Sequence, residues 1–171
     1  MATSKQKGKK NCSQLPIQDA RNFQYKILNN TLYLNNRLAL FGFANTTNCS
    51  FCGTSEENFN HLFVECSFTT ALWQELISYF PPLVFPALTP QGAYLGFLDD
   101  KIENLFLINH ILLIFKIYVY NSRDVKRLSF VALLARIEKI FNLEIKSQLI
   151  RNDNVYTDKW RCITHILSPV Q

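Results

Sequence analysis

The stretch Cys49-Ser-Phe-Cys52, with His61 and Cys66 downstream, decides how the first half of this 171-residue chain folds. The run reads C-x2-C-x8-H-x4-C. Three thiols and one imidazole are the ligand set of a closed tetrahedral zinc site. Gly53 directly follows the first pair and supplies the permissive backbone that a tight turn between two ligands often needs. The pattern therefore predicts a Cys3His zinc finger whose metal ligands are Cys49, Cys52, His61 and Cys66.

The second half of the motif has helical spacing. His61 and Cys66 lie five residues apart, a little over one turn of a helix, so both side chains can point at the same ion. Four protein ligands leave no open coordination position. We therefore expect the zinc to be structural and not to activate water.

Two other interpretations compete with zinc. Cysteine is common in cores as a small hydrophobic residue, and a lone histidine is usually a satisfied core residue. A disulfide framework is the other, but five cysteines are an odd number, and Met1–Lys10 lacks the apolar region of a signal peptide. We expect a reducing compartment, the nucleus and/or the cytoplasm, where thiols bind metals instead of pairing. Cys12 and Cys162 lie outside the cluster and receive no role.

The composition favours packed helices. Hydrophobic residues make up 48% of the chain, which excludes a disordered protein. There are 14 Phe and 7 Tyr against only 5 Gly, which is too few for a turn-rich sandwich. We predict a mainly α fold, with a small zinc-stapled Cys3His finger followed by a helical, bundle-like region.

The net charge of +5 is unevenly distributed. Four lysines precede residue 11, residues 11–100 sum to −4, and residues 101–171 sum to +5. Three thiolates on one divalent zinc add a further formal negative charge to the finger. Because affinity for nucleic acid depends on Lys and Arg displacing counterions, the finger itself is a poor phosphate binder. The basic arm and the C-terminal half are the better candidates.

Hydrophobic periodicity divides the chain into helical segments. Residues 17–40 have apolar side chains at helical spacing, and Asn29-Asn30 can break this stretch in two. A second helix is expected from about residue 60 to 79, with Phe68 on its apolar side, and a last long helix over 129–150, with Val131 on its buried face. Residues 151–171 are ambiguous, although Trp160 and Ile163 could dock this end on the core.

Prolines mark the expected domain boundary. Pro81, Pro82, Pro86 and Pro90 should stop regular structure between the two halves. The sequence therefore predicts four regions: a flexible basic arm (1–16), a helical segment with the zinc finger (17–80), a proline-rich linker (81–98) and a helical C-terminal region (99–171).

Residues 102–121 are strongly apolar and raise the question of a membrane span. Its apolar run, Leu105–Tyr120, is shorter than the roughly 20 apolar residues that a span requires, and it contains Asn109, His110 and Lys116. Polar and charged groups are rare inside membranes. We expect a buried core helix, with no membrane partner.

Several segments carry a resemblance to a known family. They are Phe23–Leu38, the Cys49-x2-Cys52 pair, His61-Leu-Phe-x2-Cys66-x6-Trp73, and the stretch Ile108–Tyr120 with Phe130 and the helix after it. Together they resemble the zinc-binding C-terminal region of non-LTR (LINE-type) retrotransposon reverse transcriptases, over roughly residues 20–150. The resemblance implies the same four metal ligands, with Trp73 packed under the finger. It also implies a parent protein that copies its own RNA into DNA at a nicked chromosomal target.

The chain departs from the whole enzyme because it has no polymerase palm. Polymerases hold catalytic metal with carboxylates from separated positions, but Asp99-Asp100 stands alone here. No nucleophile is paired with a base either. We therefore expect no enzymatic activity from this chain by itself.

Two functions remain open. The first is a nucleic-acid-binding module, RNA more than DNA, in which exposed aromatic rings stack on unpaired bases. Its phosphate contacts would be Arg123, Lys126, Arg127, Arg136 and Lys139. The second is a zinc-stabilised protein-interaction scaffold, docking the polymerase part of a retroelement protein or serving as a host protein derived from one. For the basic residues, an ordinary solvated helix face is the alternative.

Overall fold

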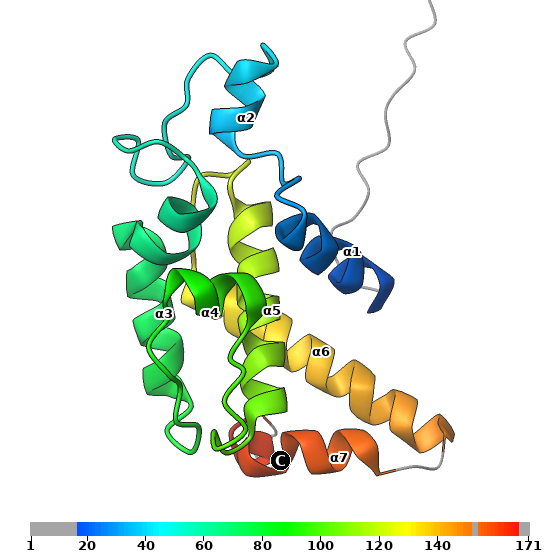
Figure 1. The fold of residues 1–171 in the computed structure, drawn as a ribbon. Coiled ribbons are helices and arrows are strands. Elements are labelled where there is room, and N and C mark those ends of the chain that lie inside the picture. Colours follow the sequence, from blue (N-terminus) through cyan, green and yellow to red (C-terminus); the bar gives the residue numbers. More distant parts are fainter. Residues whose placement is uncertain (1–16, 152–153, 168–171) are drawn as a thin grey trace, which may run out of the picture.

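The computed structural model describes residues 17–151 and 154–167. These residues form helices and no named β-strand (Figure 1). The elements are α1 (Ile17–Leu28), α2 (Asn35–Leu40), the π-helical turn η1 (His61–Glu65), α3 (Ser67–Tyr79), α4 (Pro90–Leu95), α5 (Leu105–Ser122), α6 (Phe130–Arg151), α7 (Val155–Trp160), the 3-10 turn η2 (Arg161–Ile163) and α8 (Thr164–Leu167). The predicted mainly α fold, with the Cys3His finger followed by helices, is confirmed.

Helix α5 is the centre of the fold. In Figure 1 it stands upright, with α1 beside it and α6 running diagonally away from it. It is apolar on all sides, which is typical of a helix buried within a protein. By length and composition alone it could span a membrane, but 61% of that stretch is buried among other elements. It packs here as a core helix.

Buried Lys116 ties α5 to two neighbouring helices. Its side chain is 2% exposed, and its Nζ donates to Gln24 Oε1 of α1 at 3.0 Å and to the Ala93 carbonyl of α4 at 2.9 Å. Burial lowers the pKa of this ammonium group to about 8. Because a buried polar group without partners is costly, these two bonds favour one arrangement of the three helices.

One hydrophobic core includes residues from both sides of the proline-rich segment. The ring centroids of Trp73 and Phe115 lie 4.9 Å apart, and those of Tyr79 and Phe130 lie 5.3 Å apart. The zinc-finger half and the C-terminal half therefore pack against each other directly.

The proline-rich segment is more regular than expected, because it contains α4. Pro90 occupies the first turn, where its missing N–H does no harm, and the Thr89 hydroxyl accepts a hydrogen bond from the Gly92 N–H at 3.1 Å. The expectation that the prolines stop regular structure was wrong at Pro90, where proline begins a helix. Gly96, with φ of 85°, ends it.

The expected break in residues 17–40 is confirmed. Asn30 adopts a left-handed φ of 49°, and the chain leaves α1 before starting α2. At the other end, Trp160 and Ile163 are both fully buried, so the last described residues do dock on the core. The predicted basic arm, 1–16, lies outside the described residues.

Two side chains assigned to buried faces are exposed. Phe68 of α3 is 55% exposed and Val131 of α6 is 75% exposed. The buried face of α3 is formed by Thr69, Leu72 and Leu76, and that of α6 by Leu133, Ile137 and Phe141. Phe68 and Val131 lie off these faces.

Candidate metal centre

The first two ligands lie in a tight turn built by the backbone. The Gly53 N–H donates to the Cys49 carbonyl at 2.9 Å, and Gly53 has a φ of 71° that few other residues adopt. The Cys49 N–H donates to the Ser55 carbonyl at 2.7 Å, which closes the loop behind the turn. These bonds bring Cys49 and Cys52 to the same side of the loop.

The other two ligands are aligned by the π-helical turn η1. The Cys66 N–H donates to the His61 carbonyl at 2.7 Å, five residues earlier. An i→i+5 bond of this kind places residues five apart above one another, and such turns are frequent at functional sites. The Asn58 side chain caps the start of the turn, because its Oδ1 accepts from the His61 N–H at 2.9 Å.

The four ligand atoms lie within 4.8 Å of one another. Cys49 Sγ and Cys66 Sγ are 3.9 Å apart, and Cys52 Sγ is 3.3 Å from His61 Nε2. Tetrahedral zinc, with bonds of about 2.3 Å to sulfur and about 2.0 Å to nitrogen, separates its ligand atoms by about 3.5–3.8 Å. The donor set and its spacing therefore fit zinc, as predicted from the sequence.

The pKa values of the two cysteines in the turn are shifted in opposite directions. Burial raises the pKa of the Cys49 thiol to about 12. Burial also acts to raise the pKa of Cys52, but hydrogen bonds from the Ser55 and Thr54 backbone, the Thr54 hydroxyl and His61 together lower it to about 5. Cys52 is therefore ready to bind a cation at neutral pH, whereas the Cys49 proton must leave when metal binds.

A buried carboxylate next to the turn was missed by the sequence analysis. Glu57, which lies between the second and third ligands in the sequence, is fully buried. Its Oε2 accepts from the Ser50 N–H at 2.7 Å, and its Oε1 lies 2.6 Å from Arg123 Nη2. No local pattern reveals this pair, because its two members come from different halves of the chain.

The five basic residues expected to contact nucleic acid have different surroundings. Lys126 and Arg127, in the turn between α5 and α6, are exposed, as is Lys139 on α6. Arg136 is half-buried. Arg123 is only 9% exposed, and its guanidinium is bonded to Glu57. A phosphate contact by Arg123 does not fit this placement.

Two small hollows adjoin the metal centre. One, of 530 Å³, lies between the chain entering α2 and the C-terminal end of α5, and includes Tyr33 and Tyr120. The other, of 370 Å³, is lined by the zinc loop itself. Asn35, Ser50 and Lys126 border both hollows, so Lys126 lies beside the zinc loop.

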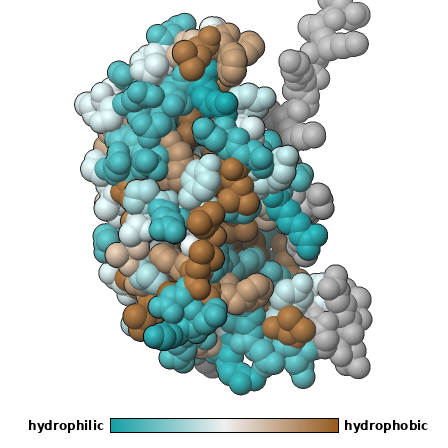
Figure 2. All heavy atoms as spheres, in the orientation of Figure 1, coloured by the Kyte–Doolittle hydropathy of each residue, from teal (hydrophilic) through white to brown (hydrophobic). Residues whose placement is uncertain are grey.

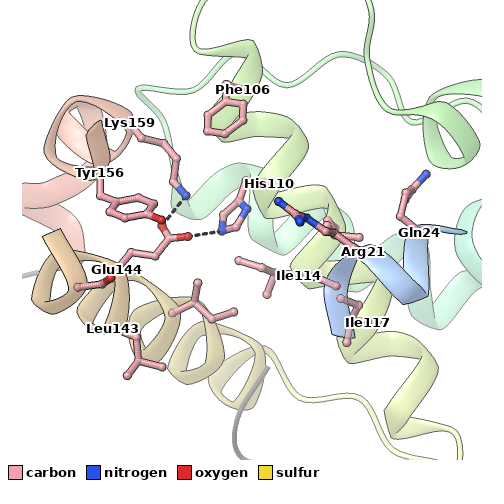
Figure 3. A pocket seen from close by; sticks show the side chains of 14 residues that line it. Arg21, Gln24, Phe106, His110, Ile114, Ile117, Leu143, Glu144, Tyr156 and Lys159 are labelled. Carbon is pink, nitrogen blue, oxygen red and sulfur yellow. Dashed lines mark ion pairs between the residues drawn. The ribbon is translucent and has the colours of Figure 1, made fainter. Parts of the chain in front are cut away.

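A larger cavity of 680 Å³ lies away from the metal, between α1, α5, α6 and α7 (Figure 3). Its walls are mostly apolar, with both aliphatic and aromatic side chains, and His110 and Lys159 both point toward Glu144. His110 Nε2 lies 3.5 Å from Glu144 Oε1, and Lys159 forms an ion pair with the same carboxylate. Burial, together with the Lys159 charge, lowers the pKa of His110 to about 4. The histidine is therefore neutral at pH 7.

The family comparison supports the metal assignment. Residues 5–73 match the family model described as zinc-binding in reverse transcriptase. No match was found among curated proteins or among solved structures. The matched stretch contains all four ligands and ends at Trp73, which is 2% exposed and packs on Phe115. The resemblance seen in the sequence is thus confirmed as far as residue 73: residues 5–73 are similar to the zinc-binding region of reverse transcriptases, and Cys49, Cys52, His61 and Cys66 are able to hold the ion. The expected resemblance of residues 74–150 stays a prediction.

Proposed function

We propose that this chain is a non-catalytic module that uses zinc to build a nucleic-acid-binding surface, with RNA preferred over DNA. The closed Cys3His ligand set supports a structural metal, because it leaves no coordination position for a substrate or water. The family description supports a connection with reverse transcription. The chain would be the tail of a retroelement protein or a host protein derived from one, acting in the nucleus and/or the cytoplasm.

The position of Lys126 is the observation that carries the proposal. Its exposed side chain borders both hollows beside the zinc loop, and its backbone adopts a left-handed φ of 52° in the turn between α5 and α6. Tyr33, whose side chain is 59% exposed, lines the larger of these two hollows together with Lys126. A cation beside an accessible ring is the combination that holds a phosphate and stacks on an unpaired base. Arg127 adds a second exposed cation to this turn.

Binding to single-stranded RNA tests the proposal. Fluorescence anisotropy with a labelled RNA, and with DNA of the same sequence, is measured at several salt concentrations. We expect the association constant to fall linearly with salt on a log–log plot, and the RNA to bind more tightly. Lys126→Ala combined with Arg127→Ala should weaken binding and flatten the salt slope by roughly two phosphate contacts.

Lys101→Ala is the matched control, because Lys101 is an exposed cation before the opposite end of α5. It should leave binding unchanged. Equal losses in the Lys101 variant and the double variant would argue for diffuse attraction without a site. No retention of RNA at low salt would overturn the proposal.

A specific observation also favours the second candidate, a protein-interaction scaffold. Leu40, Phe41 and Phe43 are 82%, 60% and 80% exposed at the end of α2. In Figure 2 hydrophobic atoms lie at this end of the molecule. Such exposed apolar groups are typical of docking surfaces. Phe41→Ser with Phe43→Ser should abolish binding to a reverse-transcriptase polymerase fragment and leave RNA binding intact if the scaffold is the main role.

A further inference from the structure

The zinc turn, residues 49–53, is held in place by a buried carboxylate that is not itself a metal ligand. Glu57 is fully buried, and both of its oxygens accept backbone hydrogen bonds. Oε2 accepts from the Ser50 N–H at 2.7 Å, and Oε1 accepts from the Asn35 N–H at 3.0 Å. Ser50 directly follows the ligand Cys49, so the Glu57 side chain sets the backbone between the first two ligands.

Asn35 braces the same turn with its side chain. Its Nδ2 donates to the Asn48 carbonyl at 2.7 Å and contacts Ser50 Oγ at 3.2 Å. Asn48 directly precedes Cys49. The first ligand, Cys49, is therefore fixed on both sides: Asn35 holds the preceding residue, Asn48, and Glu57 holds the following residue, Ser50.

The charge that balances Glu57 comes from the other half of the chain. Arg123, which follows α5, places Nη2 2.6 Å from Glu57 Oε1 and 3.2 Å from Asn35 Oδ1. Its Nη1 donates to the Tyr33 carbonyl at 2.9 Å, and its guanidinium lies 5.0 Å from the Tyr120 ring centroid. One arginine thus joins the chain before α2, the zinc turn and the end of α5.

Buried ion pairs of this kind demand good geometry. Taking two charges out of water is unfavourable unless the pair is close and its remaining hydrogen-bonding groups are satisfied. Removing only one partner leaves the other charged and buried, which is strongly destabilising. The Glu57 carboxylate can therefore hold Ser50 in place only while Arg123 is present.

We propose that Glu57 and Arg123 are positioning residues of the metal centre, so that zinc affinity depends on the end of α5. Arg123 lies outside residues 5–73, the stretch that matches the zinc-binding family. The zinc-binding region is therefore incomplete without the helical half. This inference is independent of nucleic-acid binding.

Zinc affinity and ligand geometry together test the proposal. Zinc is titrated into the full chain in competition with a chromophoric chelator, and cobalt(II) is used as a spectroscopic substitute for zinc. Arg123→Met removes the guanidinium while keeping an unbranched side chain, and Glu57→Gln removes the charge at nearly constant shape. Groups that orient metal ligands typically change affinity by about 10- to 100-fold, and we expect zinc to bind more weakly by this factor in both variants. The cobalt ligand-field bands should shift, because the first pair of ligands loses its support.

Two controls separate positioning from general stability. Arg127→Met changes an exposed arginine in the adjacent turn and should leave zinc affinity unchanged. Ile137→Val alters a fully buried side chain of α6 and should lower the melting temperature without changing the cobalt spectrum or the zinc dissociation constant. If Glu57 and Arg123 were purely structural, their variants would likewise lower the melting temperature and leave the cobalt spectrum and the zinc dissociation constant unchanged.

The proposal is overturned if Arg123→Met and Glu57→Gln fold and bind zinc with the affinity and cobalt spectrum of the unaltered protein. If neither single variant folds, Glu57→Gln combined with Arg123→Met takes their place, because it leaves no unpaired buried charge. Weaker zinc binding in that double variant supports the proposal, and unchanged zinc binding excludes it.

Discussion

At the scale of single residues, the effect of replacing a cysteine on the zinc content should depend on whether that cysteine is a ligand. Cys52→Ser removes one of four ligands, and serine does not replace a thiolate on zinc. We expect the purified protein to lose its zinc, from roughly one ion per chain to nearly none, as measured by metal analysis.

Cys162→Ser is the control for this change, because Cys162 lies in η2, outside the ligand cluster. It should keep its zinc. Full zinc content in the Cys52 variant would contradict the assignment of the ligands.

His110 should make the protein less stable in mild acid. Burial and the Lys159 charge lower its pKa from 6.5 to about 4, while Glu144 opposes this shift. The unfolded chain therefore takes up a proton at His110 more readily than the folded protein. The stabilisation is complete above pH 6.5 and is lost as the pH falls toward 4. Between pH 7 and pH 4.5 the loss amounts to about 2–3 kcal/mol.

Urea unfolding at both pH values measures this effect. His110→Phe keeps the ring packed against Trp160, whose centroid lies 5.6 Å away, but removes the titrating group. The variant should lose less stability than the unaltered protein over the same pH range. Equal losses would show that other groups, including the zinc ligands, account for the acid sensitivity.

At the scale of elements, Gly96 ends α4 in a way that excludes other residues. Its φ is 85°, and an added Cβ would lie 2.8 Å from Asn109 Oδ1. Asn109 cannot move easily, because it accepts from the Phe97 N–H and donates to the Phe97 carbonyl. Gly96→Ala should therefore destabilise the protein by about 2–4 kcal/mol in chemical denaturation.

Gly42→Ala provides the comparison. Gly42 has a similar φ of 73°, but nothing lies within 4 Å of the added Cβ. This variant should show only the backbone strain, about 1 kcal/mol. If the two variants lose the same stability, the contact with Asn109 contributes nothing.

Hydrophobic periodicity located the long helices within a few residues, because α5 and α6 have many apolar side chains at helical spacing. Periodicity did not detect the two elements that depend on particular hydrogen bonds, η1 and α4. The π-helical turn η1 depends on a bond between His61 and Cys66, which periodicity does not detect. Helix α4 depends on the Thr89 cap in a stretch where four prolines suggested no structure.

At the scale of the whole molecule, zinc should stabilise both halves together, because they share one core and the Glu57–Arg123 pair. Free zinc at about 1,000 times its dissociation constant adds about 4 kcal/mol, or roughly 8–16 °C in melting temperature for a chain of this size. Circular dichroism should show one transition that moves as a unit when a chelator is added. The Cys52→Ser variant should not respond to zinc. Two separate transitions, of which zinc moves only one, would contradict this expectation.

Part of the metal centre could be predicted from the sequence. The four ligands could be recognised because their spacing is set within eighteen residues of chain. Arg123 was expected to contact phosphate because it clusters with Lys126 and Arg127 just before the last long helix. Its partner Glu57 lies far away in the chain, and only the folded structure brings the two charges together.

The contacts of Lys116 also give the protein an internal chemical reporter. Burial alone lowers the pKa of Lys116, so once solvent reaches it the side chain becomes an ordinary lysine amine that acylating reagents modify like a surface lysine. It is 2% exposed and bonded to α1 and α4, so it should stay unmodified while surface lysines react. Mass spectrometry can follow this single site over time. The rate at which Lys116 becomes acylated would then measure how often α1, α4 and α5 come apart.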